Sequence, residues 1–169
     1  MKYCRPMPRT RAMLVLLALA MPVTARAGGS EWRNVAPYSD DVMKVMEQLK
    51  WEVFRSGDYY KRNPKRKPKS PQQALEMSGE EGTHSIMDMS KVSLAEAGRF
   101  KCPIATVCPL PKADLVRLFG TERPTRTMVD AYDKRLALST FQPRGSGVWI
   151  KIYEGTTPKQ IYFAGVSGD

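Results

Sequence analysis

Two alternating segments near the C-terminus constrain the fold more than any other feature of the sequence. GVWIKIY (residues 147–153) and KQIYFAGV (residues 159–166) both alternate between apolar and other side chains, and EGTT lies between them. Alternation with a period of two is typical of a β-strand. Two such runs around a short polar turn predict an antiparallel β-hairpin, and therefore a sheet.

The length of the turn decides which side chains share a face of this hairpin, because a slip of one residue moves every side chain to the other side. A five-residue loop would mix apolar side chains with Gln160 and Tyr162. A four-residue loop, which is a common hairpin length, gives one wholly apolar face. We therefore expect the four-residue loop, with a core face made of Val148, Ile150, Ile152, Ile161 and Phe163.

The opposite face of the expected hairpin is rich in aromatic side chains. Trp and Tyr combine a large contact area with a polar tip, and for this reason they often anchor interfaces. The sequence therefore predicts a partner-binding face made of Trp149, Lys151, Tyr153 and Tyr162. The alternative is a second core, in which a helix that contains Val129 and Tyr132 covers these aromatic side chains.

Four other segments carry apolar residues at helical spacing and have recognisable ends. These segments are SDDVMKVMEQLKWEVFRSGDYY, SPQQALEMSGEEG, PKADLVRLFG and TRTMVDAYDKRLAL. THSIMDM (residues 83–89) is expected to be a strand, and RFKCPIATVCPLP is rich in β-formers but interrupted by prolines. The predicted fold class is α+β: a small antiparallel sheet that ends in the C-terminal hairpin and is packed by three or four helices on one face.

The N-terminus has the three parts of a secretory signal peptide. The basic segment MKYCRPMPRTR is followed by the uncharged run AMLVLLALAMPV and then by TARAGG, with small residues before the expected cleavage after Ala27. The apolar run is too short to span a bilayer, which needs about 20 residues. We therefore predict a cleaved leader (residues 1–27) and one mature domain (residues 28–169), which is periplasmic or secreted and has no transmembrane segment. The alternatives are an uncleaved membrane anchor and a buried helix.

The formal net charge of +10 comes mostly from two short segments. Residues 1–27 hold five basic residues and no acid, which leaves 22 basic and 17 acidic residues in the predicted mature chain. Six of these 22 lie in KRNPKRKPK (residues 61–69), which three prolines in or just after it interrupt. We call residues 61–69 the basic loop. The rest of the mature chain is close to neutral.

The basic loop has two interpretations. Proline and charge repulsion would keep a solvated linker extended. Alternatively, Lys65, Arg66 and Lys67 contact an anionic envelope component, such as lipid headgroups, a polysaccharide or an acidic protein. A nucleic-acid partner is not expected, because such proteins spread cations over a face and interleave aromatic side chains, whereas here Tyr59 and Tyr60 lie only at one edge.

The mature chain keeps two of the three cysteines, Cys102 and Cys108. Two cysteines this close in an exported protein predict a disulfide, provided that the chain turns between them. The alternative is a pair of free, buried thiols. We expect no metal site, since more ligands would be needed and His84 is the only histidine. No cofactor is expected either, because a glycine-rich phosphate loop, CxxC and HExxH are all absent from the sequence.

The candidate catalytic residues are His84 and Asp88 in GTHSIMD. On a strand these two would share a face, as a base and its orienting carboxylate, whereas Ser85 would point the other way. No nucleophile accompanies them, and a lone histidine is more often structural. The sequence therefore favours an exported bacterial envelope protein that acts as a non-enzymatic binding or inhibitor module of the immunity type. The alternative is a small exported hydrolase that uses His84 with a neighbouring carboxylate.

Overall fold

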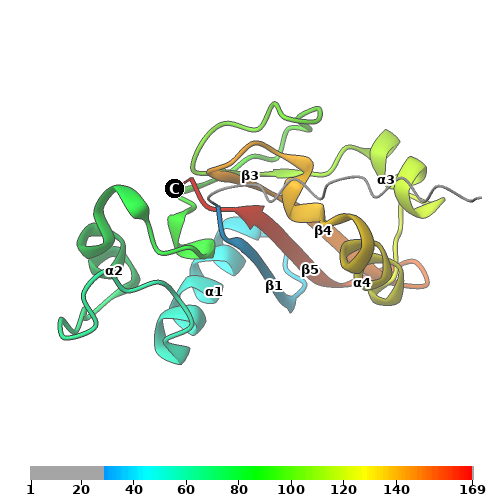
Figure 1. The fold of residues 1–169 in the computed structure, drawn as a ribbon. Helices are drawn as coiled ribbons and strands as arrows, with labels where there is room; N and C mark the ends of the chain where they lie inside the picture. Colours follow the sequence, from blue (N-terminus) through cyan, green and yellow to red (C-terminus); the bar gives the residue numbers. More distant parts are fainter. Residues whose placement is uncertain (1–28, 169) are drawn as a thin grey trace, which may run out of the picture.

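The computed structural model describes residues 29–168, so the predicted signal peptide lies outside the described residues. Its centre is a five-stranded sheet with the strand order β1-β5-β4-β3-β2 (Figure 1). The strands are β1 (Glu31–Pro37), β2 (Lys91–Val92), β3 (Thr106–Pro109), β4 (Ser146–Glu154) and β5 (Thr157–Val166). β1 and β4 both pair antiparallel with β5, whereas β3 pairs parallel with β4 and with β2. The fold class is α+β, as predicted, but the sheet is mixed rather than antiparallel.

All four predicted helices are present: α1 (Val42–Ser56), α2 (Pro71–Ser78), α3 (Lys112–Phe119) and α4 (Arg126–Leu136). The cap of α1 is Asp41, whose side chain accepts a hydrogen bond from the Lys44 N–H. Ser70 caps α2 and Pro71 is its first residue. Three short 3-10 helices, Gly79–Glu81, Ile86–Asp88 and Leu138–Phe141, complete the described helical elements.

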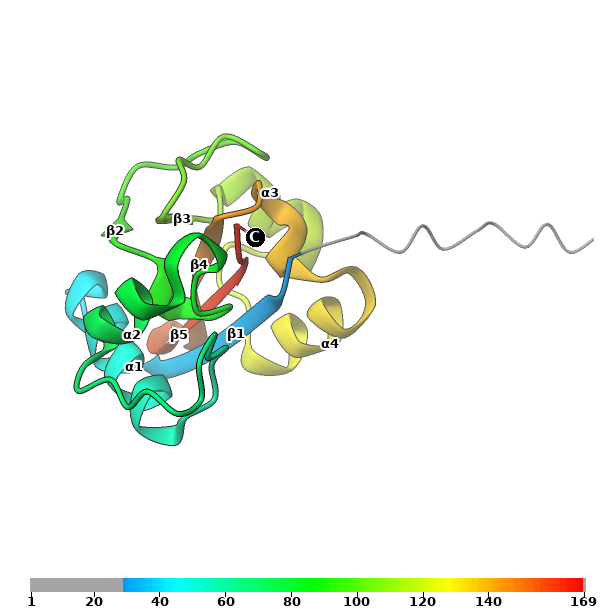
Figure 2. The ribbon, with the colours of Figure 1, turned by 60° about the vertical axis from the view of Figure 1, so that its left-hand side comes forward.

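Helices cover both faces of the sheet, which corrects the expectation of a single covered face (Figure 2). On one face, α1 buries Met46 and Leu49 against a cluster that includes Phe163. On the other face, Val129 of α4 packs in a cluster that includes Ile150. Because packed elements cover both faces of the sheet, both faces of the hairpin strands β4 and β5 must be apolar.

The register of the β4–β5 pair differs from the predicted one. Trp149 lies opposite Phe163 and Ile150 opposite Tyr162, and the ladder is irregular between Ile152 and Tyr153. Such a bulge adds one residue on one strand, so the side chains that follow it change face. The predicted apolar face is therefore wrong, because Ile150 and Phe163 belong to different cores.

Strand β1 was not predicted from the sequence, and Trp32 explains how it packs. The Trp32 ring lies against Gly147 and Gly165, which face each other in β4 and β5. A Cβ atom at either glycine would overlap the ring. The two glycines thus allow the buried Trp32 to lie directly on the sheet.

THSIMDM (residues 83–89) is a turn followed by a 3-10 helix, and not a strand. Asp88 Oδ1 accepts hydrogen bonds from the backbone N–H (2.6 Å) and the hydroxyl (2.7 Å) of Thr83. The Ser85 hydroxyl accepts one from the Met87 N–H at 3.2 Å. Such local side-chain bonds compete with a strand ladder. None of the helices within residues 29–168 combines the length and the apolar character that crossing a bilayer requires.

Candidate functional site

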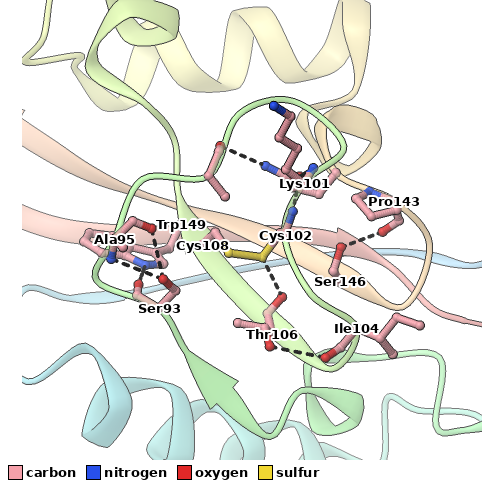
Figure 3. Close-up of a disulfide and its surroundings, with 12 residues drawn as sticks. Ser93, Ala95, Lys101, Cys102, Ile104, Thr106, Cys108, Pro143, Ser146 and Trp149 are labelled. Carbon is pink, nitrogen blue, oxygen red and sulfur yellow. Dashed lines mark hydrogen bonds between the residues drawn. A yellow bond between two sulfur atoms is a disulfide. The ribbon is translucent and has the colours of Figure 1, made fainter.

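Cys102 and Cys108 form the disulfide that the sequence predicts, with an S–S distance of 2.06 Å and a Cα–Cα distance of 5.9 Å. Cys108 lies in β3, whereas Cys102 lies in the connection between β2 and β3 (Figure 3). We call residues 93–105 the disulfide loop. The covalent bond ties this loop to an inner strand of the sheet.

Two buried side chains from other elements also hold the backbone of the disulfide loop. Oε1 of Gln142 accepts hydrogen bonds from the backbone N–H groups of Lys101 (3.1 Å) and Cys102 (3.0 Å). The indole N–H of Trp149 donates to the carbonyl of Ser93 at 3.0 Å (Figure 3). The loop is thus held at its first residue and again near its C-terminal end, although most of it faces solvent.

Three large apolar side chains of the disulfide loop are exposed: Leu94 (76% exposed), Phe100 (55%) and Ile104 (78%). Phe100 has a φ of 61°, in the left-handed region, which costs a residue with a side chain about 1–2 kcal/mol. Strain of this kind concentrates at functional sites. Single exposed apolar residues need no explanation, but here three of them lie on one anchored loop.

The neighbourhood of Phe100 is concave and carries charges of both signs, since Arg144 and the acidic Glu31 line the cavity beside the ring. A cavity of about 480 Å³ adjoins its ring and is also lined by Gln142 and Val166. The Arg99 guanidinium carbon lies 4.8 Å from the centre of the Phe100 ring, and Lys101 is exposed. This end of the molecule therefore combines apolar contact area, a hollow and two flanking cations. Of the features of this loop, only the disulfide was anticipated from the sequence.

The predicted partner-binding face on the hairpin is not assembled. Trp149 is only 7% exposed and Tyr162 only 3%, and they lie in the cores on opposite faces of the sheet. Lys151 and Tyr153 are half-buried, and Lys151 Nζ donates to the Tyr38 hydroxyl at 3.2 Å. The bulge next to Tyr153 is the physical reason, since it shifts β4 against β5 by one residue. The expectation that these four side chains share one open face is wrong.

Tyr162 instead belongs to a buried polar network that the sequence analysis missed. Its hydroxyl donates to Oδ2 of Asp133 at 2.8 Å, and Arg33 of β1 donates to the same carboxylate. Burial, followed by the hydrogen bond and the charge of Asp133, raises the pKa of the Tyr162 hydroxyl. One signal in the sequence could have revealed this network. Asp133 is an acid four residues after Val129, so it falls on the apolar stripe of the predicted helix. The network joins α4 to β1 and β5, and its three side chains also line a cavity of about 550 Å³.

His84 and Asp88 do not form the predicted base and carboxylate pair. Both hydrogen bonds that the Asp88 carboxylate accepts come from Thr83. His84 has a φ of 55°, stacks on Tyr60 at 4.5 Å between ring centres, and places Nδ1 3.0 Å from the Ser30 hydroxyl. The arrangement fastens the 83–89 turn to the chain just before β1. His84 is not among the residues that line the cavity next to Phe100.

The six cations of the basic loop are all exposed, including Lys65, Arg66 and Lys67. The loop joins α1 to α2, which lie side by side in both views (Figures 1 and 2). It therefore connects two helices that contact each other. The predicted contact with an anionic partner stays a prediction.

Within residues 29–168, no group of three or more His, Cys, Asp and Glu side chains is placed to hold a metal ion. No protein-family model, curated protein or solved structure matches this chain. The function is therefore argued from the surfaces described above.

Proposed function

We propose that the protein is an exported binding module of the bacterial envelope, which inhibits a protein partner in the manner of an immunity protein. The contact surface is the disulfide loop. The observation that carries this proposal is that Leu94, Phe100 and Ile104 are held in solvent by a loop with a disulfide and buried hydrogen bonds at its base.

An anchored apolar loop suits inhibition for energetic reasons. Binding costs free energy whenever a flexible segment must become ordered, and a loop that is already held in one conformation avoids most of that cost. Aromatic side chains that enter a pocket of the partner contribute most of the affinity at typical interfaces. Phe100 is the natural anchor, since it is large, exposed and next to a cavity.

The charges around Phe100 define the chemistry of the partner. Arg99 and Lys101 flank the exposed ring. Complementary charges at the rim of an interface raise the rate of association and exclude partners of like charge. We therefore expect the partner to present an apolar pocket with an acidic rim.

Export is supported by two independent features. The first 27 residues have the organisation of a signal peptide. The disulfide of the mature domain is of a kind that persists in oxidising compartments and is rare in the cytosol. N-terminal sequencing of the protein from a periplasmic or culture-medium fraction should begin after Ala27, whereas a soluble cytosolic pool with an intact Met1 would contradict export.

Capture from envelope extracts tests the contact surface. The tagged mature protein should retain a specific partner, and Phe100→Ser with Ile104→Ser should abolish the capture while the melting temperature stays nearly unchanged. Val116→Ser with Met128→Ser is the matched control, because these apolar side chains are also exposed but lie on α3 and α4. Equal capture by both double variants would overturn the assignment of the surface.

The alternative function, a small exported hydrolase, has one observation in its favour. The Ser30 hydroxyl lies 3.0 Å from Nδ1 of His84, which is the reach of a nucleophile and its base. A fluorophosphonate probe, which reacts with activated serines, discriminates between the two functions. A binding module leaves Ser30 unlabelled, whereas labelling of Ser30 that disappears in His84→Ala would establish the hydrolase.

A further inference from the structure

The basic loop folds back on the molecule and is tied down at both ends. The ring of Tyr59 stacks on Phe54 of α1 at 6.1 Å between ring centres, and the Tyr60 N–H donates to the Thr83 carbonyl at 2.8 Å. At the other end, the N–H of Lys69 donates to Oε1 of Gln73 at 2.7 Å. These contacts fix the chain at the two ends of the basic loop.

Four cations elsewhere in the described chain have carboxylate partners. Arg33, Lys50, Arg117 and Arg126 each pair with a carboxylate. Within residues 29–168, none of the six cations of the basic loop does so. Six like charges within nine positions repel one another. A bound anion would relieve this repulsion.

Three of the six cations surround one small cavity. Lys61, Arg62 and Arg66 line it together with Asn63 and the two tyrosines, and its apolar side comes from Ala74 and Met77 of α2. The cavity holds about 20 Å³, which is slightly more than one water molecule needs. One oxygen atom of a compact group is therefore the most that this cavity encloses.

Acidic side chains are absent from the lining of this cavity. The acid that comes near is Glu81, which hydrogen-bonds to Tyr60 and raises the pKa of its hydroxyl. Glu81 is not among the lining residues. Lys65, Lys67 and Lys69 also lie outside the lining, so the loop divides into cavity cations and outer cations.

We propose that Lys61, Arg62 and Arg66 form a binding site for a terminal phosphoryl group, carried by a lipid headgroup or by a small soluble phosphate. The two guanidinium groups offer planar, forked donors that match a tetrahedral oxyanion, and Lys61 adds a point charge. The Asn63 side chain supplies a further neutral donor. This site goes beyond the proposed function and is independent of it. It lies in the connection between α1 and α2, whereas the disulfide loop lies in the connection between β2 and β3.

Titration with inorganic phosphate at constant ionic strength tests the site, with binding followed by calorimetry on the mature protein. Arg62→Gln with Arg66→Gln removes two cavity cations, and Lys65→Gln with Lys67→Gln removes the same charge from outside the cavity. All four side chains are exposed, so both variants should fold, and their circular dichroism should match the wild type. We expect the arginine variant to bind at least about tenfold more weakly and the lysine variant to bind nearly as the wild type.

Two results would overturn the proposal: no saturable binding of phosphate by the wild type, or equal weakening in the two variants, which would indicate a diffuse charge effect. Vesicles distinguish the two sources of the phosphoryl group. Preferential binding to phosphatidic acid over phosphatidylglycerol, competed by inorganic phosphate and lost in the arginine variant, assigns the site to a lipid headgroup. Saturable phosphate binding without that preference assigns it to a soluble phosphate.

Discussion

The disulfide loop and the basic loop are both long, exposed connections, but they expose opposite kinds of side chain. The disulfide loop presents Leu94, Phe100 and Ile104, and it is held by a covalent bond and by two buried side chains of the body. The basic loop presents six cations, and it is tied mainly where it joins α1 and α2.

The difference follows from what each kind of side chain requires in water. Exposed apolar groups on a flexible loop would collapse onto the body or aggregate, so they remain available only where the backbone is fixed. Cations remain solvated without such support. We infer that the disulfide loop is held in its conformation before it meets a partner, whereas the basic loop keeps its charges in solvent without such support. Four predictions test this contrast.

Trp149→Ala should have the largest effect, because Trp149 is both a core residue and the donor that holds Ser93. Truncation of a large buried aromatic side chain costs about 3–5 kcal/mol of unfolding free energy. Urea denaturation measures this loss. Trp51→Ala is the control, since Trp51 is 42% exposed and its loss should cost less than about 1 kcal/mol. Similar losses of unfolding free energy in the two variants would contradict the view that Trp149 contributes more to stability than the more exposed Trp51.

Replacing both Cys102 and Cys108 by Ser should have the next largest effect. The disulfide closes a loop with a sequence separation of six residues, and on the chain-entropy model its removal costs about 2 kcal/mol. The wild type in reductant should show the same shift of the denaturation midpoint. An unchanged midpoint would mean that Gln142 and Trp149 alone hold the disulfide loop.

The sequence predicted those parts of the fold that local chemistry determines. Ser70 and Pro71 mark the start of α2 whatever lies around them. Two nearby cysteines in a chain with an expected signal peptide predict the disulfide between them. The α+β class also followed, because four helical segments and one hairpin are visible as local patterns.

What the sequence did not predict depends on partners that are distant along the chain. The predicted register of the hairpin was wrong because the bulge after Ile152 has no local signal in the sequence. A shift by one residue moves Trp149 and Tyr162 to opposite cores. The prediction that helices cover only one face of the sheet failed for the same reason, since the elements that cover the second face are distant along the chain. The anchoring of the disulfide loop by Gln142 joins residues about 40 positions apart, so no local pattern reports it.

Ser70→Ala should have a smaller effect, on the side of the basic loop. The Ser70 hydroxyl accepts a hydrogen bond from the Gln73 N–H at 3.1 Å, and loss of such a cap costs about 1 kcal/mol. Thermal denaturation measures the loss, with Ser56→Ala as a control, because Ser56 caps no helix start. A cost equal to that of removing the disulfide would indicate that the two loops are equally anchored.

Changing Lys65, Arg66 and Lys67 together to Gln should have the smallest effect on stability. These side chains are exposed and pair with no carboxylate within residues 29–168, so their removal breaks no contact of the folded state. We expect the unfolding free energy in the absence of ligand to change by less than about 0.5 kcal/mol. Any change should be towards greater stability at low salt, because three mutually repelling charges are gone, and added salt should remove the difference by screening. The measurement is a pair of denaturation curves at low and high salt for each protein. A clear loss of stability in the triple variant at both salt concentrations would show that the basic loop is held by its charges, and it would then resemble the disulfide loop rather than contrast with it.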